Sequence, residues 1–233
     1  MPTPPAFDLR TLPGRTRVRL TGSDCAKFLH NFCTADVKKL TPGQTVEAFV
    51  TNVKARALFH IWITCDDDAL LVETWPGQAE PLVAHLDRYL ITEDVEIIDE
   101  TEDVPEDPST EATRIAAGLP RCGVDFGEGN LAPEIGRPDA ISYTKGCYLG
   151  QEPIARLDAL GHVNKEVVAV EIDADVPPPR ETELTADGKT AGKLTSSAAV
   201  GGRVYGIATV RAKFLTPETS LTAAGAAVTV RRG

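Results

Sequence analysis

Residues 145–152 read Lys-Gly-Cys-Tyr-Leu-Gly-Gln-Glu, which places one thiol, one ammonium, one carboxylate and two glycines within eight positions. A thiol is chemically useful mainly as the thiolate, and a nearby lysine and the amides of a following helix both favour that anion. Gly146 and Gly150 carry no Cβ, so the backbone there can turn sharply or approach a ligand closely. The segment therefore predicts a site that holds an anion or a planar ligand beside a reactive Cys147.

The same segment leads into a predicted helix. Pro153 is tolerated only in a first helical turn, so the helix begins within residues 150–152. Cys147 then lies just before a helix N-terminus, where the macrodipole favours an anion. The local sequence supplies no partner base, however, and a free cysteine is most often a small buried hydrophobe. An inert Cys147, with glycines that only shape a turn, stays an alternative on this spacing alone.

The eight residues resemble the K-G-C-[FY]-x-G-Q-E signature of the YgfZ family, folate-binding relatives of the glycine-cleavage T protein, an aminomethyltransferase. The resemblance covers most of the chain and includes residues 17–29, 34–43 and 114–134 and the region after Lys165. The family usually carries a longer insertion between Ile98 and Arg114. The resemblance therefore implies a short form, in which an acidic linker of about residues 99–111 replaces part of the middle region.

The alternation of apolar residues predicts an α+β fold. We expect strands at 16–20, 45–51, 57–64, 69–74 and 95–98, and helices at 24–33, 79–90 and 109–117. Ser23 is expected to cap the first of these helices. Short β segments follow at 167–172, 183–185, 190–195, 204–210 and 227–230, a pattern typical of a small barrel. Together with the resemblance, this pattern predicts a T-protein-like module with a mostly antiparallel sheet over residues 1–164, and a C-terminal β-barrel domain over residues 165–233.

Composition sets the outer limits. The 233 residues are 42% hydrophobic and 25% charged, as in globular proteins. No apolar run approaches the ~20 residues that span a bilayer. Residues 1–5 show no signal-peptide pattern, so we expect a cytoplasmic protein without a membrane partner. The five cysteines are scattered and contain no C-x-x-C, which indicates reduced thiols and no local metal-ligand set.

The net charge of −10 comes from one segment. Residues 93–111 hold ten acidic and no basic side chains, and the rest of the chain is balanced. Because Pro105 and Pro108 lie within it, the second half predicts a solvated linker, with an acidic docking segment as the alternative. No basic stripe with interleaved aromatic residues is present, so direct nucleic-acid binding is not expected.

The resemblance implies a folate-binding accessory protein for the maturation or repair of iron–sulfur enzymes, more a binding protein than an enzyme. Its partners would be iron–sulfur client or carrier proteins, and tetrahydrofolate would lie in a central cavity between the α+β part and the barrel. The signature carries over Cys147 as a reactive thiol, and Lys145, Gly146, Tyr148, Gln151 and Glu152 as ligand-binding residues. Gln151 and Glu152 have helix capping as an alternative role. Lys54 and Arg56 are weaker candidates for the opposite wall, with a solvated basic turn as the alternative.

Two enzymatic readings stay open. A T-protein-like aminomethyltransferase would need an acidic pair where this chain has Phe59 and His60. His60 would then serve as a base or, as for most histidines on apolar strands, as a structural residue. Ala55, at a position where the family more often has glycine, leaves the geometry of the preceding turn open. The second reading is a thiol enzyme with Cys147 as nucleophile and His162 as base.

Overall fold

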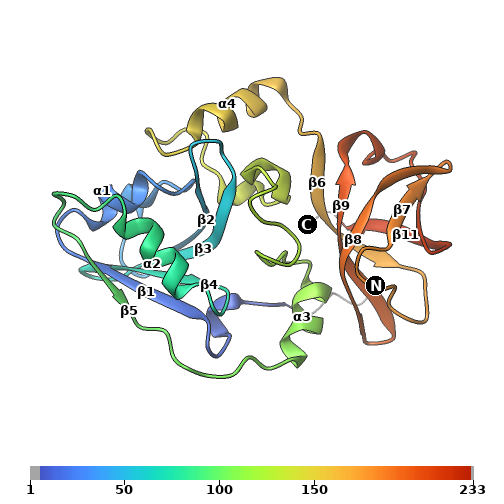
Figure 1. The fold of residues 1–233 in the computed structure, drawn as a ribbon, viewed down its shortest axis with the longest axis horizontal. Helices are drawn as coiled ribbons and strands as arrows, with labels where there is room; N and C mark the ends of the chain where they lie inside the picture. The colour runs from blue at the N-terminus through green and yellow to red at the C-terminus, as the bar shows by residue number, and fades with distance from the viewer. Residues whose placement is uncertain (1–5, 232–233) are drawn as a thin grey trace.

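A five-stranded sheet and a closed six-stranded barrel form the two ends of the molecule (Figure 1), and the computed structural model describes residues 6–231. The predicted lack of a signal pattern in residues 1–5 falls outside this range. The sheet runs in the order β2-β3-β4-β1-β5 with antiparallel pairing throughout. Its strands are β1 (Thr16–Thr21), β2 (Thr45–Thr51), β3 (Ala57–Cys65), β4 (Ala69–Thr74) and β5 (Glu96–Asp99). The predicted α+β class is confirmed.

Two helices, α1 (Cys25–His30) and α2 (Ala79–Asp87), cover one face of the sheet. Their apolar side chains, including Phe28 and Leu82, share one core with the strands. Both helices are shorter than predicted. The predicted cap is wrong, because the Ser23 hydroxyl donates to the Asp94 carboxylate at 2.8 Å. Asp24 occupies the N-cap position instead and makes no side-chain cap.

The barrel closes in the order β10-β11-β6-β9-β8-β7. Its strands are β6 (Lys165–Ile172), β7 (Glu183–Ala186), β8 (Lys189–Val200), β9 (Arg203–Arg211), β10 (Leu221–Ala223) and β11 (Ala226–Arg231). The sequence pattern missed only β10, because a strand of three residues shows no alternation. Buried aliphatic side chains fill the interior of the barrel, as is usual for small barrels. The division into domains at residue 164 stays a prediction.

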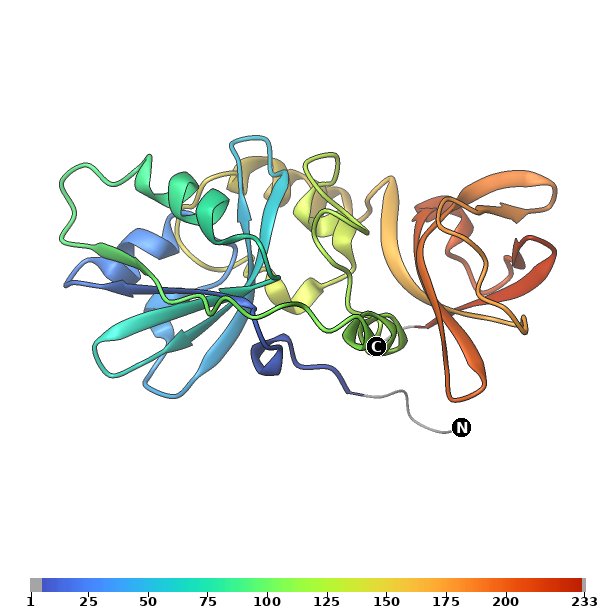
Figure 2. The same cartoon turned by 60° about the horizontal axis from the view of Figure 1, so that its bottom comes forward.

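Between the two ends lie α3 (Ser109–Ala117) and α4 (Gln151–Leu160). Figure 2 shows α3 lying between the sheet and the barrel, and Figure 1 shows α4 bridging above them. The buried Arg114 of α3 donates to Asp125 at 2.6 Å, and Asp125 also accepts hydrogen bonds from Thr195 and Ser196 of the barrel. This buried ionic cluster, which we call the Arg114 cluster, ties the middle of the chain to β8.

The acidic segment crosses from the sheet to α3 without helix or strand between residues 100 and 107. Residues 102–109 are exposed, as expected for a solvated linker. The linker is nevertheless held in place by cations from other segments. Glu100 pairs with Arg19 at 2.6 Å, and Glu106 pairs with Arg121. Within residues 6–231, no helix has the length and apolar character needed to cross a membrane.

Candidate functional site

The signature loop, residues 142–150, is fixed by hydrogen bonds between its backbone and two distant segments. Leu149 donates to the carbonyl of Asn31 at 2.8 Å, just after α1. The hydroxyl of Thr51, at the end of β2, donates to the carbonyl of Leu149 at 2.5 Å. Gly150 has φ 86°, and a Cβ there would collide with the carbonyl of Asn52. Glycine is therefore required at this position, both for the left-handed conformation and for the close approach.

Lys145 is buried beneath this loop. Its Nζ donates to the carbonyls of His30 and Cys33, each at 2.6 Å, and lies 4.5 Å from the centroid of the Tyr148 ring. Burial lowers the pKa of Lys145 to about 8. The ammonium thus sits at the C-terminal end of α1, where the helix dipole favours a cation. Within residues 6–231 no hydrogen bond joins this ammonium to Cys147, and the influence of its charge on the thiol stays a prediction.

Cys147 alone is exposed among the five cysteines, all of which lie within residues 6–231. Cys25 and Cys33 are buried, and burial raises the pKa of both thiols. Cys122 is partly buried, and burial raises its pKa to about 11. The loop, which is held by its hydrogen bonds, therefore exposes one thiol to solvent in a fixed position.

Residues 148–152 of the signature border an open groove of about 520 Å³ beside α4. The groove is lined by Val53, Leu131, Arg156, Leu157 and residues 148–153. Tyr148 is buried, Gln151 is half-buried with its Nε2 3.5 Å from the Lys145 carbonyl, and Glu152 is exposed and pairs with Arg156 at 3.2 Å. Gly146 has no close neighbour, because an added Cβ would only reach ordinary contact with His30.

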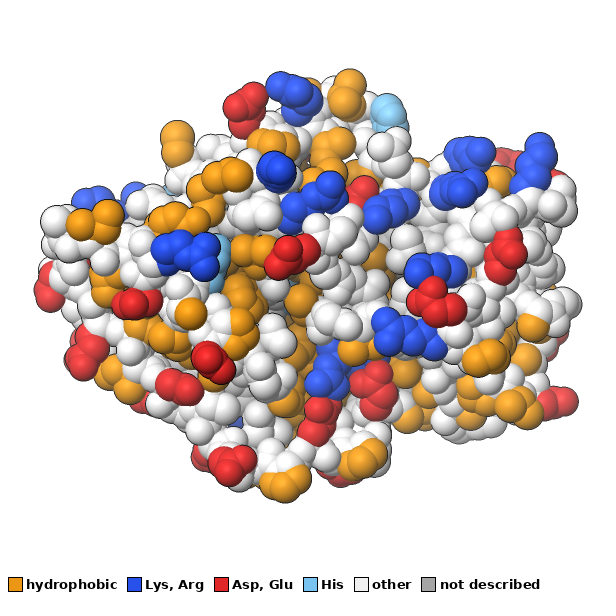
Figure 3. Space-filling view, viewed as in Figure 1, with side chains coloured by type: hydrophobic (Ala, Val, Ile, Leu, Met, Phe, Trp, Pro, Cys, Tyr) orange, Lys and Arg blue, Asp and Glu red, His pale blue; other side chains and the backbone are white. Residues whose placement is uncertain are grey.

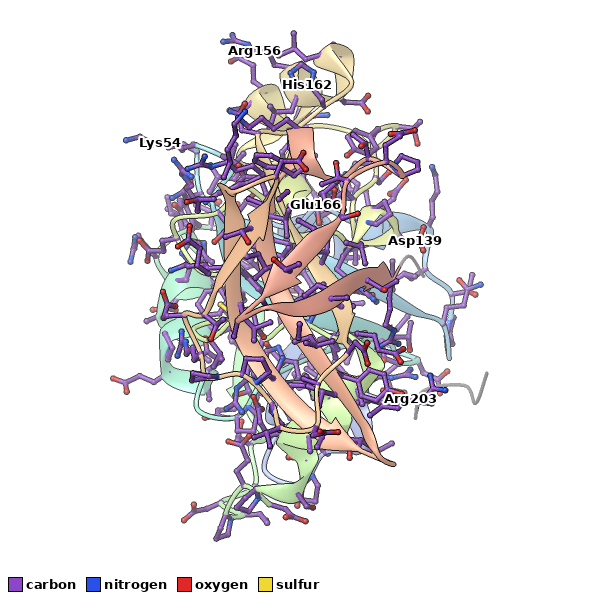
Figure 4. The ribbon with its side chains drawn as sticks, turned by 90° about the vertical axis from the view of Figure 1, so that its right-hand side faces the viewer. Lys54, Asp139, Arg156, His162, Glu166 and Arg203 are labelled. Atoms are coloured by element: carbon purple, nitrogen blue, oxygen red, sulfur yellow. The ribbon has the colours of Figure 1, made fainter. Side chains whose placement is uncertain are left out.

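Lys54 and Arg56 do not line this groove. Lys54 is exposed and points outward in Figure 4, and Arg56 donates to the carbonyl of Gly129 at 2.8 Å. Between them, Ala55 adopts φ 60° although its side chain is fully buried. The turn thus keeps the left-handed conformation that favours glycine, although this chain has alanine at position 55.

His60 lies in the interior with no exposed surface. Its Nε2 is 2.5 Å from Oε1 of Glu47. Its ring stacks on Phe49 at a centroid distance of 4.8 Å and makes a tilted contact with Trp62 at 4.3 Å. Burial lowers the pKa of His60. Arg137 makes a bidentate pair with Glu47: its Nε donates to the carboxylate at 2.7 Å and its Nη2 donates at 2.5 Å. Burial opposes the charge of Glu47, but these hydrogen bonds prevail and lower its pKa to about 2.

Sequence reasoning missed Glu47 and Arg137. Glu47 lies opposite Trp62 in the β2–β3 register, and Arg137 is 90 residues away along the chain. The signal that was available for Glu47 is a charged residue within a strand of otherwise uncharged residues. Nothing local marks Arg137.

Cys147 precedes α4 and His162 follows it, and within residues 6–231 no hydrogen bond joins the two side chains. His162 is exposed, with Nδ1 3.0 Å from the carbonyl of Leu160, and Figure 4 shows it on the outer edge of the molecule. The structure therefore does not assemble the base that a Cys147 thiol enzyme would need.

A second cavity, of about 500 Å³, lies between the middle segment, residues 117–138, and the barrel, and we call it the central cavity. Its apolar wall includes Ile135, Val167 and Ile207, and its charged residues are Glu166, Arg137 and Arg231. Figure 3 shows the face on which the two ends meet, with Lys and Arg side chains gathered over its upper part and Asp and Glu over its lower left. None of the signature residues lines the central cavity.

Comparison with known proteins agrees with this architecture. Residues 164–233 match the family described as CAF17, C-terminal beta-barrel domain. The human mitochondrial iron-sulfur cluster assembly factor IBA57 is 36% identical over 84 residues, which are 31% of this chain and 24% of that protein. The mouse IBA57 is 24% identical over 260 residues, 78% of this chain and 73% of that protein. These matches support the resemblance to YgfZ- and CAF17-type proteins that the signature indicates.

Two further matches bear on the length and the fold of this chain. A chloroplastic protein of Arabidopsis thaliana, named as a transferase, is 26% identical over 259 residues, 77% of this chain and 59% of that protein. The chain thus spans less than two thirds of the plant and human relatives. The crystal structure of glycine cleavage system aminomethyltransferase T from Bartonella henselae superposes with a TM-score of 0.82 at 13% identity, covering 94% of this chain and 83% of that one. The predicted T-protein-like fold is confirmed.

Proposed function

We propose that this protein is a folate-binding accessory factor in the maturation or repair of iron–sulfur proteins. The observation that carries the proposal is the exposure of Cys147 alone on a loop that is fixed to α1 and β2. A rigidly presented thiol with no base beside it suits contact with another protein and its cluster better than covalent catalysis. The names of the human and mouse relatives support the same role. Iron–sulfur client or carrier proteins would be the partners.

Tetrahydrofolate is proposed to occupy the central cavity. A volume of about 500 Å³ is within the range of small-molecule sites. Its apolar wall suits a planar ring system, and Arg137 and Arg231 suit the carboxylates of a glutamate tail. In this proposal Tyr148, Gln151 and Glu152 line the groove beside α4, and Gly146 belongs to the loop that leads into it. Lys54 and Arg56 lie in the turn that follows Val53, which lines the groove. The cytoplasmic location is also kept as a proposal, although the named relatives are mitochondrial or chloroplastic.

An aminomethyltransferase-like enzyme is the alternative, and the T-protein-like fold is the observation that favours it. The groups near the expected catalytic position argue against it. Glu47 is held by Arg137 and His60, and a carboxylate with a pKa of about 2 is a weak base at neutral pH. Any transferase activity would therefore need a different proton acceptor.

Titration of the purified protein with tetrahydrofolate, followed by a methylene-transfer assay with an aminomethyl-lipoyl carrier protein, tests the two functions together. The accessory role predicts saturable binding without turnover. Turnover at a rate that falls when the folate is omitted would instead favour the transferase. A Cys147→Ser variant that fully restores iron–sulfur enzyme activity in a deletion strain would remove the thiol from the proposal.

A further inference from the structure

We infer that Glu47 and His60 position Arg137 so that its guanidinium binds a carboxylate of the ligand in the central cavity. The inference rests on the proposed function for the identity of that ligand. It assigns Arg137 as the binding residue, and Glu47 and His60 as positioning residues that act through it.

One edge of the Arg137 guanidinium is hydrogen-bonded to Glu47, and the other edge is free to bind a ligand. Its Nε and Nη2 donate to the two oxygens of Glu47 at 2.7 and 2.5 Å, which fixes the plane of the guanidinium. Within residues 6–231 its Nη1 has no hydrogen-bond partner, and the side chain is 36% exposed and lines the central cavity. A carboxylate on the cavity side could therefore accept from Arg137 without displacing Glu47.

The buried histidine explains why Glu47 keeps this orientation. Glu47 is 13% exposed, and one of its oxygens is shared between Arg137 and His60. His60 cannot turn away, because its ring is stacked on Phe49, contacts Trp62 and has no exposed surface. With no route to solvent or ligand, this imidazole orients a neighbour and does not exchange protons with a substrate.

A second cation lines the same cavity. Arg231 donates through Nη1 to the carbonyl of Ala116 at 2.7 Å and lies 5.1 Å from the centroid of the Tyr205 ring. Both guanidinium groups are thus anchored by contacts outside the cavity. Glu166 is the one carboxylate in the lining, so the two anchored cations outnumber it. Together with the apolar wall they fit a planar molecule that carries carboxylates, such as the aminobenzoyl-glutamate part of a folate.

Calorimetric titration with 5-formyltetrahydrofolate and with its dimethyl ester tests the assignment, because the two ligands differ in the charge of the glutamate. Wild type should bind the free acid more tightly. Arg137→Gln should weaken binding of the acid by about tenfold to a hundredfold and leave binding of the ester within about twofold. Arg137→Lys should lose part of the affinity, because lysine cannot make the fork to Glu47. Arg203→Gln, which removes a comparable ion pair with Glu171 at 3.1 Å on the barrel, is the matched control.

The positioning role is tested by a pair of His60 variants. His60→Gln keeps a donor toward Glu47 and should retain most of the preference for the acid, whereas His60→Phe keeps the stacking and should lose the preference. A merely structural role would change the affinities for acid and ester equally in both variants, and that result overturns the positioning assignment.

p-Aminobenzoylglutamate separates this inference from the proposed function. If wild type binds the folate but Arg137→Gln loses nothing, or loses equally for acid and ester, the Arg137 assignment is overturned and folate binding stands. If wild type binds p-aminobenzoylglutamate in an Arg137-dependent way but no folate, the carboxylate site is supported and folate binding is overturned. If wild type binds neither, both fail.

Discussion

Two buried cations join distant parts of this chain, and they are stabilised in opposite ways. Lys145 connects the signature loop to the end of α1 and is surrounded by neutral carbonyls. Arg114 connects α3 to the barrel and is paired with the carboxylates of Asp125 and Glu111. Burial lowers the pKa of Lys145 to about 8. Burial also opposes the charge of Arg114, but the carboxylates outweigh it and raise the pKa.

The two contacts therefore differ in how they respond to pH. We call the contact at Arg114 the permanent joint and the contact at Lys145 the adjustable joint. The Arg114 guanidinium stays charged at every pH at which the protein is folded, so the cation that ties α3 to the barrel is permanent. The Lys145 ammonium can lose its proton at a pH of about 8, which is close to the pH inside cells. It lies directly beneath the loop that presents Cys147. The two joints should therefore respond differently to mutation and to pH.

The largest expected effect is at the permanent joint. Arg114→Met leaves the Asp125 carboxylate buried without its cation and should lower the free energy of unfolding by about 3–5 kcal/mol, as measured by urea denaturation. The double variant Arg114→Met, Asp125→Leu should be less destabilised than the single one, because no unpaired charge remains. Arg203→Met, at an exposed pair, should cost less than about 1 kcal/mol. Equal losses in the Arg114 and Arg203 variants would contradict the cluster's role.

A backbone change at the loop should come next. Gly150→Ala must keep a left-handed conformation, which costs about 1–2 kcal/mol, and must displace the Asn52 carbonyl, an overpacking cost of about 1–3 kcal/mol. Urea denaturation should show this loss, and hydrogen exchange should localise it to the loop. Gly161→Ala is the matched control, since it has a similar φ of 71° but open space around it. Similar losses at both glycines would show that the contact with Asn52 does not matter.

Lys145→Met should have a smaller effect that depends on pH. At pH 7 the variant leaves two carbonyls without a donor, a loss of about 1–3 kcal/mol. Between pH 8 and the free-lysine value of about 10.4, the unfolded chain binds more protons than the folded one, so wild-type stability gains with rising pH. The advantage of wild type over Lys145→Met should therefore grow across this window, by at most ~3 kcal/mol. The stability advantage of wild type over Arg114→Met should not change with pH in this window. If the advantages over the two variants changed with pH to the same extent, the contrast between Lys145 and Arg114 would be refuted.

The smallest expected change in stability accompanies modification of the thiol itself. Alkylation of the folded protein, followed by mass spectrometry, should label Cys147 about tenfold or more faster than Cys25 or Cys33, because only Cys147 is exposed. The modified protein should unfold within about 0.5 kcal/mol of the unmodified one. If Cys33 reacts as fast as Cys147, the loop and α1 open together and the Lys145 joint is weaker than its geometry indicates.

The sequence predicted what depends on local pattern. Alternation located nearly every strand, and Ser109–Ala117 ends at Gly118, φ 77°, as expected for a helix exit. The signature also located the exposed thiol. Local pattern could not supply the direction of a side chain. Lys145 is two residues from Cys147, yet its ammonium is hydrogen-bonded to carbonyls more than 110 residues away in sequence.

The cavity residues were beyond sequence reasoning for a related reason. Arg137 and Glu47 meet only because the central segment folds back against β2. His60 was weighed as a base, but its role depends on burial and on stacking partners that no spacing reveals. Roles that arise from long-range contacts need the fold before they can be assigned.

The open sheet has two outer strands, and the acidic segment protects one of them. At β2 a bridge from Cys33 to Val50 covers part of the edge. β5 is only four residues long, and its first and last side chains, Glu96 and Asp99, are exposed carboxylates. Short strands with charged ends resist pairing with a strand from another molecule. The uneven charge of the chain thus keeps neighbouring copies from joining their sheets, and replacing Glu96 and Asp99 with valine would invite aggregation through β5.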